Sequence, residues 1–125
     1  METKSKVYIL LILSIVWMLI IFTLCTLPTS NFPKLKILHL DKIVHFGFFF
    51  VQSVLFSLLF HFKLCKRYFQ IILLSTFCVF VYGGIIEIVQ SQFFNRSGEF
   101  EDLIADVLGG LFGGIVYPAI LKLFS

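Results

Sequence analysis

Charged side chains are scarce in this chain, and their scarcity excludes a soluble globular protein. Only 14% of its 125 residues are charged and 59% are hydrophobic, whereas about 25% of a typical soluble domain is charged. Because this number of charges is too small to cover a water-facing surface, lipid is expected to be the solvent for much of the protein. The chain also lacks basic runs interleaved with aromatic residues, so nucleic acid is not an expected partner.

A disulfide framework is not expected either. The three cysteines are Cys25, Cys65 and Cys78, an odd number, and they lie in or beside apolar runs. We therefore interpret them as small buried hydrophobic residues.

Long apolar runs dominate what is present. Four stretches, each with at most one Asp, Glu, Lys or Arg, cover about residues 7–27, 43–62, 68–90 and 103–121. A helix needs about 20 apolar residues to cross a bilayer. The runs do not alternate in polarity, which argues against a β-barrel. The sequence therefore predicts an all-α integral membrane bundle of four transmembrane helices with short loops, forming a single domain over residues 1–125.

The first apolar run has an alternative interpretation as a secretory signal peptide. Lys4 and Lys6 precede it, as a basic region would. However, the run is longer than the usual 7–15 residues of a signal core, and no small-x-small cleavage site follows it. A retained helix is therefore expected.

The distribution of basic residues predicts the orientation. With the N-terminus in the cytoplasm, six Lys and Arg residues lie inside and four lie outside. The inner set is Lys4, Lys6, Lys63, Lys66, Arg67 and Lys122, and the outer set is Lys34, Lys36, Lys42 and Arg96. Because cytoplasmic loops carry the excess of Lys and Arg, both termini are predicted to be cytoplasmic.

Polar groups gather at one end of the predicted bundle. The start of the second helix, the end of the third and the start of the fourth lie at the same membrane level, whichever way the protein faces. An ionisable group there is costly, so it usually marks function or a buried pair. We predict a ligand-binding cleft lined by Asp41, His45, Glu87, Gln90, Arg96, Asp102 and Asp106.

Helical spacing indicates that the polar residues of each predicted helix point in a common direction. Asp41 and His45 are four residues apart, and Glu87 and Gln90 are three apart, so each pair shares a helix face. On the fourth helix, Asp106 shares a face with the glycines that follow it.

Small residues predict where the helices approach most closely. Gly83 and Gly84 precede the acid of the third helix by one turn, and Gly109 and Gly113 form a Gly-x-x-x-Gly pattern in the fourth. Such patterns let helix backbones approach closely. We therefore expect the third and fourth helices to pack against each other at these four glycines, with the acids facing inward.

Structural interpretations of the polar residues remain open. Asp41 is suited to cap a helix, Arg96 to be a solvated loop cation, and Glu87 to form a purely structural ion pair. A catalytic interpretation takes His45, Glu87 and Arg96 as candidates, with Asp41 orienting His45 as general base. No metal or other cofactor is expected, because the spacing of these residues is not a recognised metal motif.

The ordered set of motifs between about residues 41 and 114 resembles the VanZ-like family. The resemblance is carried, in chain order, by Asp41-Lys42-x-x-His45-Phe46, Glu87-x-x-Gln90, Arg96 and Asp102-x-x-x-Asp106-x-x-Gly109-x-x-x-Gly113. It implies a bacterial cytoplasmic-membrane protein linked to susceptibility to the glycopeptide teicoplanin. The family pattern usually has Asn where this chain has Asp106, so the chain adds a negative charge and loses an amide donor there.

Three functions follow as hypotheses. The first is a non-catalytic envelope protein whose outer cleft binds a membrane lipid head group, a lipid-linked cell-wall precursor or a partner protein of the envelope. The second is a membrane-embedded enzyme acting on a lipid-linked substrate, with His45 as general base. The third, a proton-coupled transporter, is the least favoured, because the inner halves of the helices carry few polar residues.

Overall fold

The protein is built from helices alone in the part of the chain that its computed structural model describes. The described residues are 3–26, 40–64, 67–93 and 100–124, and all of them except Arg67 are helical. The elements are α1 (Thr3–Thr26), α2 (Leu40–Leu64), α3 (Tyr68–Phe93), α4 (Phe100–Leu121) and the 3-10 helix η2 (Lys122–Phe124).

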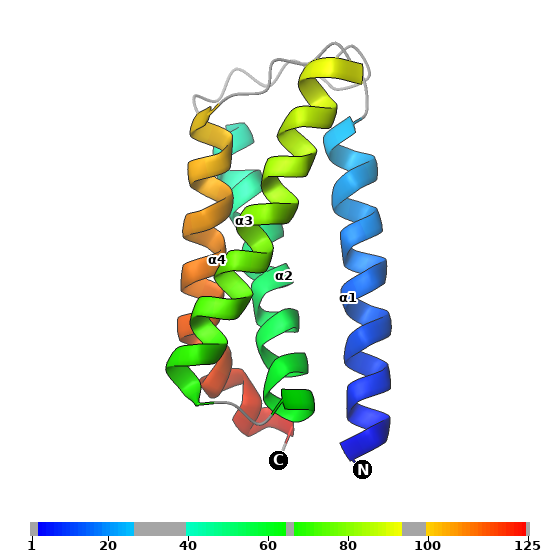
Figure 1. Ribbon diagram of the computed structural model, residues 1–125, viewed down its shortest axis with the longest axis vertical. Helices are drawn as coiled ribbons and strands as arrows, with labels where there is room; N and C mark the ends of the chain where they lie inside the picture. The colour runs from blue at the N-terminus through cyan, green and yellow to red at the C-terminus, as the bar shows by residue number, and fades with distance from the viewer. Residues whose placement is uncertain (1–2, 27–39, 65–66, 94–99, 125) are drawn as a thin grey trace.

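The four α-helices run side by side and alternate in direction (Figure 1). Each is long and apolar enough to cross a membrane, with spans of 21 to 23 residues. The all-helical architecture and the four membrane-crossing candidates are thus as the apolar runs predicted. The beginning of α1 and the end of α4 lie at one end of the bundle, and the beginning of α2, the end of α3 and the beginning of α4 lie at the other (Figure 1).

All four helices extend further into polar sequence than the apolar runs indicated, and the first begins at Thr3 rather than at 7. The second begins at Leu40 rather than at 43, the third ends at Phe93 rather than at 90, and the fourth begins at Phe100 rather than at 103. Glu101 and Asp102 thereby fall in the first turn of α4, where negative charge is favoured by the helix dipole. Polar residues that lie beyond the apolar runs, and that the runs alone would place in loops, are therefore held in helices.

Large apolar side chains cover much of the outer surface, and the interior holds polar side chains beside apolar ones. Phe69, Phe77 and Ile43 are between 63% and 66% exposed, whereas Gln52 and Ser57 are fully buried. In water this arrangement would be unfavourable, because burial of apolar surface drives folding there. It suits a protein whose solvent is hydrocarbon.

The most extensive helix pair is α2 with α4, and α1 lies at the side of the bundle. Hydrogen bonds fasten α1 to its neighbours: Trp17 Nε1 donates to the Phe48 carbonyl at 2.8 Å, and the Tyr82 hydroxyl donates to the Met18 carbonyl. Buried Ile21 completes the contact by packing with the apolar cluster around Phe49.

Serine hydroxyls join the central helices in the middle of the bundle. Ser57 on α2 donates to the Ser75 hydroxyl on α3 at 2.9 Å, and Ser75 donates to the Ile71 carbonyl one turn earlier. Ser53 on α2 donates to the Gly110 carbonyl on α4. Hydrogen bonds of this kind hold helices together where no hydrophobic effect acts between them.

The glycines allow close packing, but not between the two helices that the sequence suggested. A Cβ atom on Gly109 would meet the Phe46 carbonyl oxygen of α2, and one on Gly113 would lie 2.5 Å from the carbonyl oxygen of the next turn of α2. The prediction that these two glycines face the third helix is therefore wrong. Their neighbour Gly110 faces Val79 of α3 instead, because consecutive residues of a helix point about 100° apart.

The glycine pair of the third helix divides in the same way. A Cβ atom on Gly83 would lie 2.8 Å from Asp106 Oδ2, so Gly83 faces α4 as predicted, whereas one on Gly84 would have nothing within 4 Å. Gly84 therefore takes no part in the close approach.

Gly109 and Gly84 differ in the space around an added Cβ atom, and this difference provides a matched pair of substitutions. Gly109→Ala should lower the free energy of unfolding by about 1–3 kcal/mol, because its Cβ meets backbone that cannot move aside. Gly84→Ala should be neutral or stabilising by up to about 1 kcal/mol, because Ala is the better helix former. Denaturant unfolding in detergent, followed by circular dichroism, measures both. Equal losses would show that α4 does not approach α2 at Gly109.

Candidate functional site

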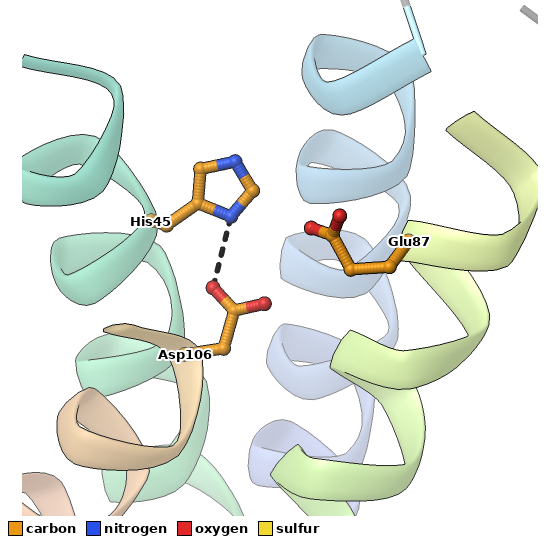
Figure 2. A group of neighbouring side chains, drawn as sticks. All are labelled: His45, Glu87 and Asp106. Carbon is orange, nitrogen blue, oxygen red and sulfur yellow. Dashed lines mark hydrogen bonds and ion pairs between the residues drawn. The ribbon is translucent and has the colours of Figure 1, made fainter. Parts of the chain in front are cut away.

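A buried hydrogen bond between α2 and α4 is the centre of the site. His45 lies in the second turn of α2 and Asp106 in the second turn of α4. Nδ1 of the imidazole lies 2.9 Å from Oδ1 of the carboxylate (Figure 2). His45 is 4% exposed and Asp106 is fully buried. The ring of His45 also stacks on Phe49 of the next turn, at 6.5 Å between centroids.

Charged groups of alternating sign continue from this pair toward the surface. Asp102 Oδ2 lies 3.9 Å from His45 Nε2, and Asp102 Oδ1 lies 3.4 Å from Lys42 Nζ. Lys42 Nζ also lies 3.8 Å from Glu101, whose side chain is 70% exposed. We call Glu101, Lys42, Asp102, His45 and Asp106 the charge chain. Exposure falls along it from the surface to the fully buried Asp106.

A third helix contributes Glu87, whose carboxylate points toward the pair (Figure 2). One ligand atom each of His45, Glu87 and Asp106 can be chosen so that all lie within 4.8 Å of one another. We call these residues the inner triad. Gly83, one turn before Glu87, faces Asp106 Oδ2, so the missing side chain leaves room for the carboxylate between α3 and α4.

Among the described residues, the site carries more acidic than basic groups. The charge chain and the inner triad together contain four carboxyl groups, on Glu87, Glu101, Asp102 and Asp106, against Lys42 and the imidazole of His45. Uncompensated charge is costly in a low-dielectric interior. The arrangement is therefore suited to hold protons or to bind a positively charged group.

No family model matches this chain, and no curated protein or solved structure matches it. The functional interpretation of the site therefore depends on the chemistry and geometry of its residues.

The structure brings together four of the seven residues predicted to line the cleft: His45, Glu87, Asp102 and Asp106. Asp41 and Gln90 lie in α2 and α3 at the same end of the bundle. The side chains of these two residues are not among those described, and Arg96 lies outside the described residues.

Two site residues were missing from the predicted cleft, and the residue that contacts the His45 ring differs from the one that the sequence suggested. Lys42 and Glu101 are members of the charge chain. The extension of the helices through these positions would have revealed them, since Lys42 precedes His45 by three residues on the same helix face. The structure gives Asp106, 61 residues away, as the hydrogen-bond partner of His45, where the sequence suggested Asp41 as the residue that orients the ring.

The importance of the buried pair can be tested at Asp106. Asp106→Ala should lower the free energy of unfolding by about 1–3 kcal/mol, because it leaves a buried imidazole nitrogen without its partner. Asp106→Asn should cost less, because the amide oxygen still accepts a hydrogen bond. Glu101→Ala is the control and should change stability by less than about 0.5 kcal/mol, since its side chain is exposed. Equal effects of the two alanine substitutions, measured by unfolding in detergent, would contradict this assignment.

Proposed function

We propose that this chain is a VanZ-like integral membrane protein of the bacterial cell envelope. It crosses the cytoplasmic membrane four times, with both termini in the cytoplasm. Its charged end faces outward and binds the amine-bearing part of a membrane lipid or of a lipid-linked cell-wall precursor. Through this binding it affects susceptibility to teicoplanin.

The surplus of carboxyl groups at one end of an otherwise apolar bundle carries the proposal. Among the described residues there, four carboxyl groups lie with one lysine and one histidine. A primary amine on a head group would supply the missing positive charge and three hydrogen-bond donors. Glu101, whose side chain is 70% exposed, is the member closest to the surface and would receive the amine first. The next carboxylate, Asp102, is buried on the other side of Lys42.

The distribution of basic residues supports the outward orientation. The charged end lies opposite the beginning of α1 and the end of α4 (Figure 1). With six basic residues on the side of the termini and four on the side of the site, the positive-inside rule favours an outward-facing site. Glycopeptide drugs act outside the membrane, so a site at this end could affect their action.

A second candidate is an enzyme in which His45 acts as general base, held by Asp106. The 2.9 Å hydrogen bond between them favours it, because an acid that orients an imidazole is a recurrent feature of catalytic histidines. However, His45 is only 4% exposed, so a substrate would reach it only after the helices move. Binding at Glu101, whose side chain is 70% exposed, needs no such movement, and we therefore place it first.

Identification of bound lipid tests the binding proposal. Wild-type protein and Asp102→Asn would be extracted from bacterial membranes in native nanodiscs, and their lipids would be quantified by mass spectrometry. Wild type should be enriched in amine-bearing lipids or precursors over the bulk membrane. Asp102→Asn should lose most of the enrichment, by about tenfold, if the ion pair contributes about 1.4 kcal/mol.

Gln92→Ala is the matched control, because Gln92 is exposed near the same end of α3 and carries no charge. It should keep the wild-type lipid profile. Teicoplanin susceptibility of the same strains gives a second readout and should change with Asp102→Asn but not with Gln92→Ala. A wild-type profile equal to that of the bulk membrane, or enrichment of anionic lipids, would overturn the proposal.

A further inference from the structure

We propose that the inner triad of His45, Glu87 and Asp106 binds one divalent transition-metal ion of the Mn²⁺, Fe²⁺ or Zn²⁺ type. This site lies deeper in the bundle than the outer members of the charge chain that would receive a lipid amine. The proposal therefore goes beyond the proposed function and stands or fails independently of it.

The separations of the three side chains suit a common ion. His45 Nδ1 and Asp106 Oδ1 lie 2.9 Å apart, and adjacent ligands of an octahedral ion with bonds of about 2.1 Å stand about 3.0 Å apart. Ligand atoms of all three residues lie within 4.8 Å of one another, and opposite ligands of such an ion would be about 4.2 Å apart. Each ligand comes from a different helix, and the Glu87 carboxylate faces the other two side chains (Figure 2).

A buried oxygen atom independently indicates a ligand. Asp106 is fully buried, and its Oδ2 accepts no hydrogen bond from any described residue. Buried polar atoms are nearly always paired, so such an exception calls for an explanation. Both Glu87 carboxylate oxygens are also shielded from solvent. A metal ion held by Asp106 and Glu87 would satisfy the Asp106 oxygen that the described residues leave without a donor.

Charge balance favours a divalent ion. A neutral imidazole and two ionised carboxylates sum to a charge of −2, and a divalent cation would bring the triad to zero inside an apolar bundle. Lys42 cannot supply this charge, because its ammonium group lies between Asp102 and Glu101, nearer the surface. Binding would release any proton held between His45 and Asp106, as expected when metal ligands lose protons.

The ligand types indicate which metals the site would accept. Mg²⁺ and Ca²⁺ prefer sites made of oxygen atoms alone, whereas imidazole suits first-row transition metals and carboxylate suits Mn²⁺. One nitrogen and two carboxylates therefore favour Mn²⁺, Fe²⁺ or Zn²⁺. The sequence predicted no metal site because its spacings match no metal motif. Ligands drawn from three separate helices leave no such motif within any one helix.

Binding of Mn²⁺ to the full-length protein in lipid-free detergent tests the proposal. Wild-type protein freed of metal by chelation would be titrated with MnCl₂, and loss of the free-ion signal in electron paramagnetic resonance would count bound ions. One saturable equivalent is expected per chain. Glu87→Gln and Asp106→Asn should each weaken binding by at least about tenfold. Glu101→Gln, the control acid at the same end, should leave it unchanged.

A wild-type measurement keeps the test valid even if a triad variant unfolds. Spin-echo modulation by ¹⁴N of an imidazole should appear in the Mn²⁺-loaded wild type, and the protein should unfold at a higher temperature with Mn²⁺ than without it. Absence of saturable binding in the folded wild type would overturn the proposal. So would binding without ¹⁴N modulation, or binding that Glu101→Gln weakens as much as Glu87→Gln does. None of these outcomes bears on lipid enrichment, which is measured separately.

Discussion

The hydrogen bond from His45 to Asp106 joins α2 to α4 in surroundings where a single uncompensated charge would be costly. Between helices in lipid, the hydrophobic effect contributes little, so close packing and polar contacts must hold them together. Both occur on one stripe of α4. Asp106 reaches His45, and Gly109 and Gly113, three and seven residues later, let the same face of α4 approach the backbone of α2. The glycines thus set the short interhelical distance at which an aspartate can contact the histidine.

The same constraint explains the polarity of the whole bundle. Apolar side chains such as Phe69 and Phe77 face outward, while Ser57 and Ser75 bond to each other inside. At one end of the bundle lies the charge chain, which extends from exposed Glu101 to buried Asp106. A positively charged group bound near the surface would therefore be electrostatically linked to His45 through groups of alternating charge. The proposed lipid and metal sites occupy the outer and inner parts of one continuous network.

The sequence predicted the parts of this structure that depend on run length and topology. The four apolar runs correspond to the four helices. Because successive helices run in opposite directions, the sequence also places Glu87, His45 and Asp106 at the same end of the bundle. The sequence did not reveal which residues of neighbouring helices contact each other. Gly109 and Gly110 are adjacent in sequence but face α2 and α3 respectively, and nothing in a helical pattern says which neighbour lies on which side. The same limit applies to His45, whose partner is 61 residues away.

We infer that His45 and Asp106 stabilise the bundle through each other. A double-mutant cycle with His45→Phe and Asp106→Ala, using unfolding free energies in detergent, measures this most directly. We predict a coupling energy of at least about 1 kcal/mol, within the range for residues in direct contact. A matched cycle of His45→Phe with Gln70→Ala, at the other end of α3, should be additive. Additivity of His45→Phe and Asp106→Ala within about 0.5 kcal/mol would show that the two side chains do not stabilise the bundle as a pair.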